Sequence, residues 1–64
     1  MMKPKNVLMD ERVFAIVARG GARCSAIAAE LLVKDFREVD RSLQRLRKAK
    51  KIRYNGTERQ WVLA

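Results

Sequence analysis

Arginine and lysine side chains supply the chemistry best suited to this 64-residue chain, which is the binding of anions. Seven cations and no acid lie between residues 41 and 53, and Leu43, Leu46 and Ile52 recur among them at regular spacing. A disordered basic tail would need no such apolar residues, so this stretch is predicted to be folded and charged at once. Its partner should be rich in phosphates or in anionic lipid.

The positive charge of the chain is uneven. The formal net charge is +8, of which residues 1–33 contribute +2 (five cations, three acids) and residues 34–64 contribute +6 (ten cations, four acids). Residues 1–5 are expected to form a flexible basic arm, and residues 6–64 a single domain. No apolar run resembles a membrane span or a signal peptide, so we expect a soluble, cytoplasmic protein, associated with the nucleoid in a bacterial cell.

Catalysis and metal binding fit the composition poorly. The chain has no histidine and its only cysteine is Cys24, so neither a zinc site nor an internal disulfide is expected. Its acids show no paired spacing beyond helix capping. We therefore expect no enzymatic activity, no metal and no cofactor. Cys24 is interpreted as a small buried apolar residue.

An apolar stripe at helical spacing predicts a first helix over residues 6–19, with these stripe positions: Met9, Val13, Ile16 and Val17. The helix should end at Gly20-Gly21, where a left-handed cap is sterically free. Asp10 could instead cap a shorter version.

A short extended link at residues 22–24 should connect this helix to a second one. Ser25 is expected to cap that compact helix over residues 26–32, whose alanines permit close approach of a neighbouring helix. Val33-Lys34 then forms the turn.

A third helix is predicted to begin at Asp35 and to run about fourteen residues from Phe36. Asp35 and Glu38 match the spacing of a capping box. At 100° per residue the apolar side chains form one stripe: Phe36, Val39, Leu43 and Leu46. The polar ones cluster on the opposite side: Arg37, Arg41, Gln44, Arg45 and Lys48.

The end of the chain alternates as strands do. Residues 51–54 and 57–63 flank Asn55-Gly56, a dipeptide typical of a two-residue type I′ hairpin turn. The alternating apolar side chains should cover the helical core, with Trp61 as its lid: Ile52, Tyr54, Trp61 and Leu63.

This order of elements predicts an α+β fold, a winged helix-turn-helix of three helices and a β-hairpin wing. The chain resembles winged helix-turn-helix proteins in "SAIAAELL", "DFREVDRSLQRLRKAKKI" and "IRYNGTERQWVLA", and most closely the small stand-alone regulators of bacteria, plasmids and phages. The resemblance implies that the third helix enters the DNA major groove and that the wing touches the adjacent backbone or minor groove.

A weaker resemblance is to Z-DNA-binding winged-helix domains. Those domains read the left-handed backbone with an asparagine and a tyrosine of the third helix and with prolines in the wing. Here Asp40 and Gln44 stand at the matching positions and the wing holds no proline.

Two sets of candidate contacts follow. Arginine forks bind guanine and glutamine amides bind adenine, so the candidate base readers are Arg37, Arg41, Gln44 and Arg45. The candidates for phosphate and wing contacts are Ser25, Lys34, Lys48, Lys50, Lys51, Arg53, Asn55, Thr57 and Arg59. The alternatives are a basic face that is merely solvated, or arginines paired with Glu38, Asp40 or Glu58.

The leading functional hypothesis is a sequence-specific regulator, a repressor that binds double-stranded DNA as a homodimer without a membrane or metal partner. The first helix with the arm, or the last strand, would supply the dimer contact. The alternatives are a protein-interaction adaptor and an RNA or replication accessory protein.

Overall fold

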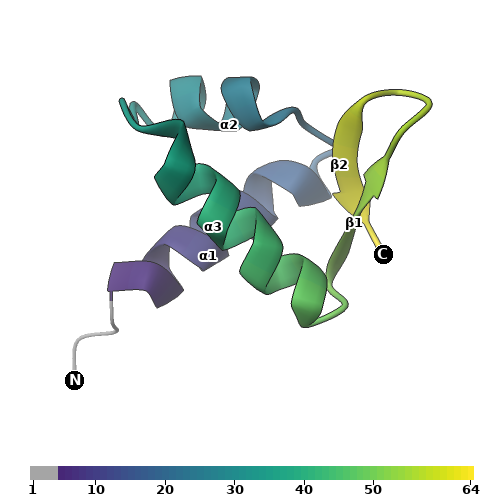
Figure 1. The fold of residues 1–64 in the computed structure, drawn as a ribbon, viewed down its shortest axis with the longest axis horizontal. Helices are drawn as coiled ribbons and strands as arrows, with labels where there is room; N and C mark the ends of the chain where they lie inside the picture. Colours follow the sequence, from purple (N-terminus) through teal and green to yellow (C-terminus); the bar gives the residue numbers. More distant parts are fainter. Residues whose placement is uncertain (1–4) are drawn as a thin grey trace.

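The computed structural model describes residues 5–64, which form three helices followed by an antiparallel hairpin (Figure 1). Their bounds are α1 Lys5–Ala18, α2 Cys24–Glu30, α3 Phe36–Lys48, β1 Ile52–Asn55 and β2 Gln60–Leu63. The predicted α+β layout of a winged helix-turn-helix is confirmed. Residues 1–4 of the predicted arm lie outside the described residues, and Lys5 is the first residue of α1.

The core collects side chains from every element. In Figure 1, α3 crosses α1, the hairpin stands at the C-terminal end of α3, and the α2–α3 turn lies at its N-terminal end. The buried apolar residues are Val13, Val17, Ala22, Ile27, Ala28, Val39, Leu43, Leu46, Ile52 and Trp61. Ile52 and Trp61 are buried, so Trp61 closes the core as predicted. The predicted cover by Tyr54 and Leu63 is wrong, since both side chains are exposed. Cys24 is half-buried against it, and this burial raises the pKa of the thiol, with the charge of Asp40 adding to the effect.

The predicted apolar stripe of α3 is wrong at Phe36, which is exposed. The buried positions are Val39, Ser42, Leu43 and Leu46. Four residues before Val39, the same face of the helix is occupied by Asp35. Phe36 lies about 70° from the centre of the buried stripe. The side chain that completes the buried face is therefore Ser42.

The predicted cap of α2 is also wrong. The N-cap is Arg23, in extended conformation and without a side-chain capping bond, and Ser25 lies inside the helix. The cause is the bridge between Ala22 and Trp61, whose two N–H···O bonds measure 2.9 and 2.7 Å. Because the bridge holds the chain extended at Ala22, the helix begins directly after Arg23.

Asn55-Gly56 does not form a two-residue turn. Asn55 pairs with Gln60, so the hairpin loop is residues 56–59, and its left-handed residue is Arg59 with φ 56°. The Asn55 side chain accepts bonds from the amides of residues 57 and 58, at 3.0 and 3.2 Å. This Asx-type turn competes with type I′. The longer loop also sets Tyr54 opposite Trp61, where the rings meet edge to face at 5.3 Å.

Replacing Gly21 by alanine should destabilise the protein by about 2–3 kcal/mol. Gly21 has φ +98°, and an added Cβ would lie 2.7 Å from Gln60 Nε2 and 3.1 Å from the Trp61 carbonyl oxygen. The substitution would strain the α1–β2 junction. Urea unfolding followed by circular dichroism measures the loss.

Gly56→Ala is the matched control, since its Cβ would meet nothing within 4 Å. It should change the free energy of unfolding by less than about 0.5 kcal/mol. Equal losses in the two variants would contradict the proposed role of Gly21.

Candidate nucleic-acid interface

One face of α3 points away from the core and carries the predicted polar set. Arg37, Arg41 and Lys48 are exposed and Gln44 is half-buried, whereas Val39 and Leu43 on the opposite face are fully buried. The last turn of α3 is basic, which complements the negative end of the helix dipole. The helix thus presents an amide and three cations on one side.

Asp35 holds the start of this face. Its Oδ1 accepts a 2.9 Å bond from the Arg37 amide, so its N-cap role is confirmed, and the Arg37 Nε lies 3.2 Å from the same oxygen. These backbone and side-chain bonds from Arg37 lower the pKa of Asp35. In a capping box the Glu38 amide would donate to the Asp35 side chain. Here that amide donates to the Asp35 carbonyl oxygen, at 3.1 Å. An ion pair this exposed is weak, so the Arg37 guanidinium can exchange it for another acceptor.

Gln44 is engaged by its neighbour. Its Oε1 accepts a 3.0 Å bond from Arg47 Nε, which leaves the Gln44 amide N–H groups to donate outward. A two-bond contact with adenine would require Arg47 to release the oxygen.

Arg45 turns toward α1 and binds Asp10. Its Nη2 lies 2.8 Å from Asp10 Oδ1, and its Nε lies 3.0 Å from Oδ2. The fully buried Ser42 hydroxyl donates to the same carboxylate. In this structure Arg45 therefore belongs to an α1–α3 ion pair and is not presented beside Arg41.

Sequence reasoning missed the Asp10–Ser42–Arg45 cluster, although a signal was present. Asp10 precedes Val13 by three residues and Val17 by seven, which places it on the apolar stripe of α1. A polar residue on the core stripe of each of two packed helices indicates a pair between them.

Burial raises the pKa of Asp10, but the bonds from Arg45 and Ser42 and the charges of Arg45 and Lys51 outweigh it, so this pKa lies below its usual value. The ionised carboxylate therefore stabilises the fold. That contribution is complete above about pH 4, where the unfolded chain also ionises, and is lost as the pH falls through the lowered folded pKa.

Asp10→Asn should accordingly lower the free energy of unfolding at pH 7 by about 1–2 kcal/mol relative to the parent. The difference should shrink as the pH falls below about 4 and through the lowered folded pKa of Asp10. Thermal unfolding across this range measures it, with the exposed Asp40→Asn as control. A difference that does not shrink as the pH falls below about 4 would contradict the ionic role of Asp10.

The phosphate candidates divide into separate groups. Lys48, Lys50 and Lys51 lie together at the end of α3, where Lys50 takes a left-handed backbone with φ 62°. Lys34 lies exposed at the opposite end of α3, and Ser25 is exposed in the first turn of α2.

The wing candidates lie on different parts of the hairpin. Thr57 and Arg59 are exposed in the hairpin loop, and the Asn55 side chain is used in the turn. Arg53 lies on the hairpin face opposite Ile52, and it lines a hollow with Val17 at the end of α1.

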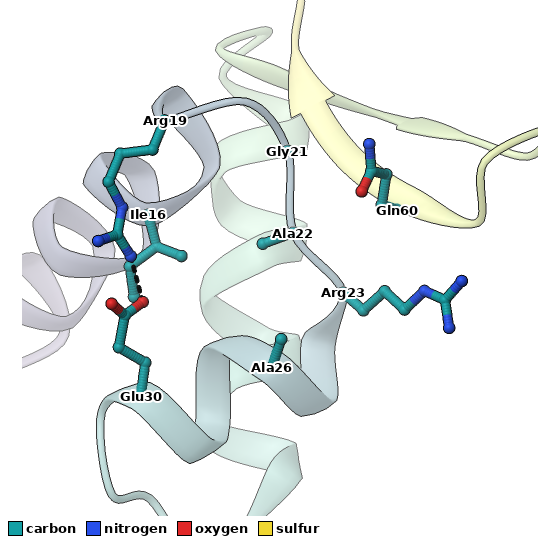
Figure 2. Close-up of a pocket in the computed structure, with 8 residues that line it drawn as sticks. All are labelled: Ile16, Arg19, Gly21, Ala22, Arg23, Ala26, Glu30 and Gln60. Atoms are coloured by element: carbon teal, nitrogen blue, oxygen red, sulfur yellow. Dashed lines mark hydrogen bonds and ion pairs between the residues drawn. The ribbon is translucent and has the colours of Figure 1, made fainter.

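A second hollow, of about 580 Å³, is bordered by the end of α1, the α1–α2 link, α2 and β2. Figure 2 shows the residues that line it. Arg19 and Glu30 form an ion pair at its edge, and the Arg23 side chain extends away from them. The opposite charges of Arg19 and Glu30 are thus engaged with each other. Within residues 5–64, no three acidic, Cys or His side chains converge on a possible metal site, and no helix is long and apolar enough to cross a membrane.

Comparison with protein-family models, with curated proteins and with solved structures finds no match.

Proposed function

We propose that this chain binds double-stranded DNA as a sequence-specific transcriptional regulator and represses by occupying its operator. In this proposal α3 enters the major groove and the hairpin wing contacts the backbone, as the resemblance to winged helix regulators implies. The observation that carries it is the two-faced α3: buried Val39 and Leu43 on one side, exposed Arg37, Arg41 and Lys48 on the other. Residues 42–53, which include Lys48, hold six cations and no acid.

Backbone strain supports the phosphate contacts. Lys50 and Arg59 have φ 62° and 56°, a conformation that suits glycine or asparagine. It costs other residues about 1–2 kcal/mol. Strain of this kind gathers at functional sites, and here both residues supply exposed cations.

We extend the proposal to a homodimer on a two-fold site, because one α3 offers few base contacts. Exposed apolar side chains mark the two surfaces that could join the copies: Val7 and Leu8 on α1, and Leu63 on β2. Half-sites would then lie about 10 bp apart.

Selection from random duplexes, followed by a hydroxyl-radical footprint on the selected sequence, tests the proposal. We expect two protected half-sites of related sequence and two chains per duplex. Failure to enrich any duplex would overturn it. Preferential binding of RNA or single strands would instead favour an accessory protein, and binding of neither would favour an adaptor.

A further inference from the structure

Two exposed apolar side chains border the proposed DNA surface without a structural role. Leu32, in the α2–α3 turn, is 89% exposed, and Phe36, the first residue of α3, is 56% exposed. These are the highest values among the large apolar side chains of residues 7–64. The core closes over Val39 and Leu43 without either of them.

The backbone at Leu32 indicates that its position is not incidental. The turn after α2 is closed by bonds from the Leu32 amide to the Ala29 carbonyl (3.3 Å) and from the Val33 amide to the Ala28 carbonyl (2.9 Å). This motif places Leu32 at φ 57°, where glycine or asparagine is usual. A bulky residue in this conformation is an outlier that lowers stability. Because such strain gathers at functional sites, we expect the Leu32 side chain to have a function.

The charge along α3 indicates what surrounds this pair. Residues 34–41 hold three cations and three acids, whereas residues 42–53 hold six cations and no acid. Attraction to phosphate is therefore concentrated at the second half of α3 and the start of the hairpin. The first half, with Leu32 and Phe36, gains little from the DNA backbone.

We propose that the first turn of α3 reads thymine through apolar contact, an inference that rests on the proposed DNA binding. In this arrangement Phe36, flanked by Leu32, packs on thymine C5-methyl groups in the major groove. The methyl is the one apolar group that base pairs present there, and it is what distinguishes thymine from uracil. Phe36 directly precedes the candidate base reader Arg37 and lies about 100° from it around the helix, so the two side chains would contact neighbouring groups in the groove.

A second copy of the chain is a poorer occupant of this patch. Stable protein interfaces bury about 800 Å² on each partner. Two side chains, bordered by Lys34 and Arg37, supply only a fraction of that area.

The test replaces thymine by uracil, one position at a time, in the duplex obtained by selection. This removes a methyl group and leaves every hydrogen-bonding group in place. At one or two positions the parent protein should lose about fourfold in affinity, the effect of one buried methyl. Phe36→Ala should bind the thymine and uracil duplexes equally. Leu32→Gly should reduce the difference in affinity between the thymine and uracil duplexes, with no loss of thermal stability.

Lys48→Ala is the matched control. It should weaken binding to both duplexes alike and reduce the salt dependence by about one unit of log–log slope. Its thymine-to-uracil ratio should equal that of the parent.

A thymine-to-uracil ratio of one at every position, or an unchanged ratio in Phe36→Ala, would overturn this inference alone. A Phe36→Ala protein that loses self-association in sedimentation, with the ratio unchanged, would assign the patch to a second copy and also overturn it. Absence of any duplex binding would overturn the proposed function, and this inference with it.

Discussion

Reversing the charge of Arg41 and Lys48 together is expected to lower the affinity for duplex DNA about 100-fold at roughly 0.1 M salt. Both side chains are exposed, seven residues apart on the outward face of α3. Each reversal removes an attraction to phosphate or base and adds a repulsion, so Arg41→Glu and Lys48→Glu should each cost about tenfold. Fluorescence anisotropy with a labelled duplex measures all three variants.

Arg12→Glu is the control for net charge. Arg12 is exposed on α1, outside the candidate surface, and its reversal changes the total charge as much as either single variant. It should weaken binding by less than about threefold. Equal losses for Arg12→Glu and Arg41→Glu would show that only the overall charge matters. No loss in any variant would favour the adaptor hypothesis.

Leu43→Ala is expected to lower the free energy of unfolding by about 3–5 kcal/mol. Leu43 is fully buried on α3, in a core that also takes Val13, Ile27 and Ile52 from other elements. The truncation leaves a cavity where these elements meet. Because small domains have thin stability margins, a large fraction of the variant should be unfolded at 37 °C.

Leu32→Ala makes the same chemical change at a side chain that is 89% exposed. It should alter stability by less than about 0.5 kcal/mol. Urea unfolding of Leu43→Ala and Leu32→Ala compares the same substitution at a buried and at an exposed position, so the difference between them measures the effect of burial. A loss below about 1 kcal/mol for Leu43→Ala would contradict the core described above.

The elements of the fold were predictable because each has a strong local signal. Gly20-Gly21 ends α1, Asp35 caps α3, and alternation marks the hairpin. The details that failed depend on distant residues. The start of α2 follows from the pairing of Ala22 with Trp61, and the loop length follows from pairing Tyr54 with Trp61. Neither pairing can be read from the dipeptides at those turns.

The outward face of α3 was predictable from helical periodicity, but the bonds within it were not. Periodicity groups Arg45 with Arg41, yet in the structure Arg45 binds Asp10, 35 residues earlier in the chain. Phe36 belongs to an apolar stripe of four residues in the sequence, but its side chain is exposed in the structure. The buried position is instead Ser42, whose hydroxyl donates to the Asp10 carboxylate. Long-range polar pairs of this kind decide which side chains stay available to a ligand.

In the proposed complex, the outward face of α3 and the wing neutralise DNA phosphates. The dependence of duplex affinity on salt concentration tests this most directly, because each neutralised phosphate releases counterions. Affinity should be measurable at about 50 mM salt, and its logarithm should fall linearly with log salt concentration, with a slope of about −4.5 to −5.5 for five or six phosphate contacts. Absence of duplex binding at about 50 mM salt, or an affinity that does not change as salt rises, would contradict the claim.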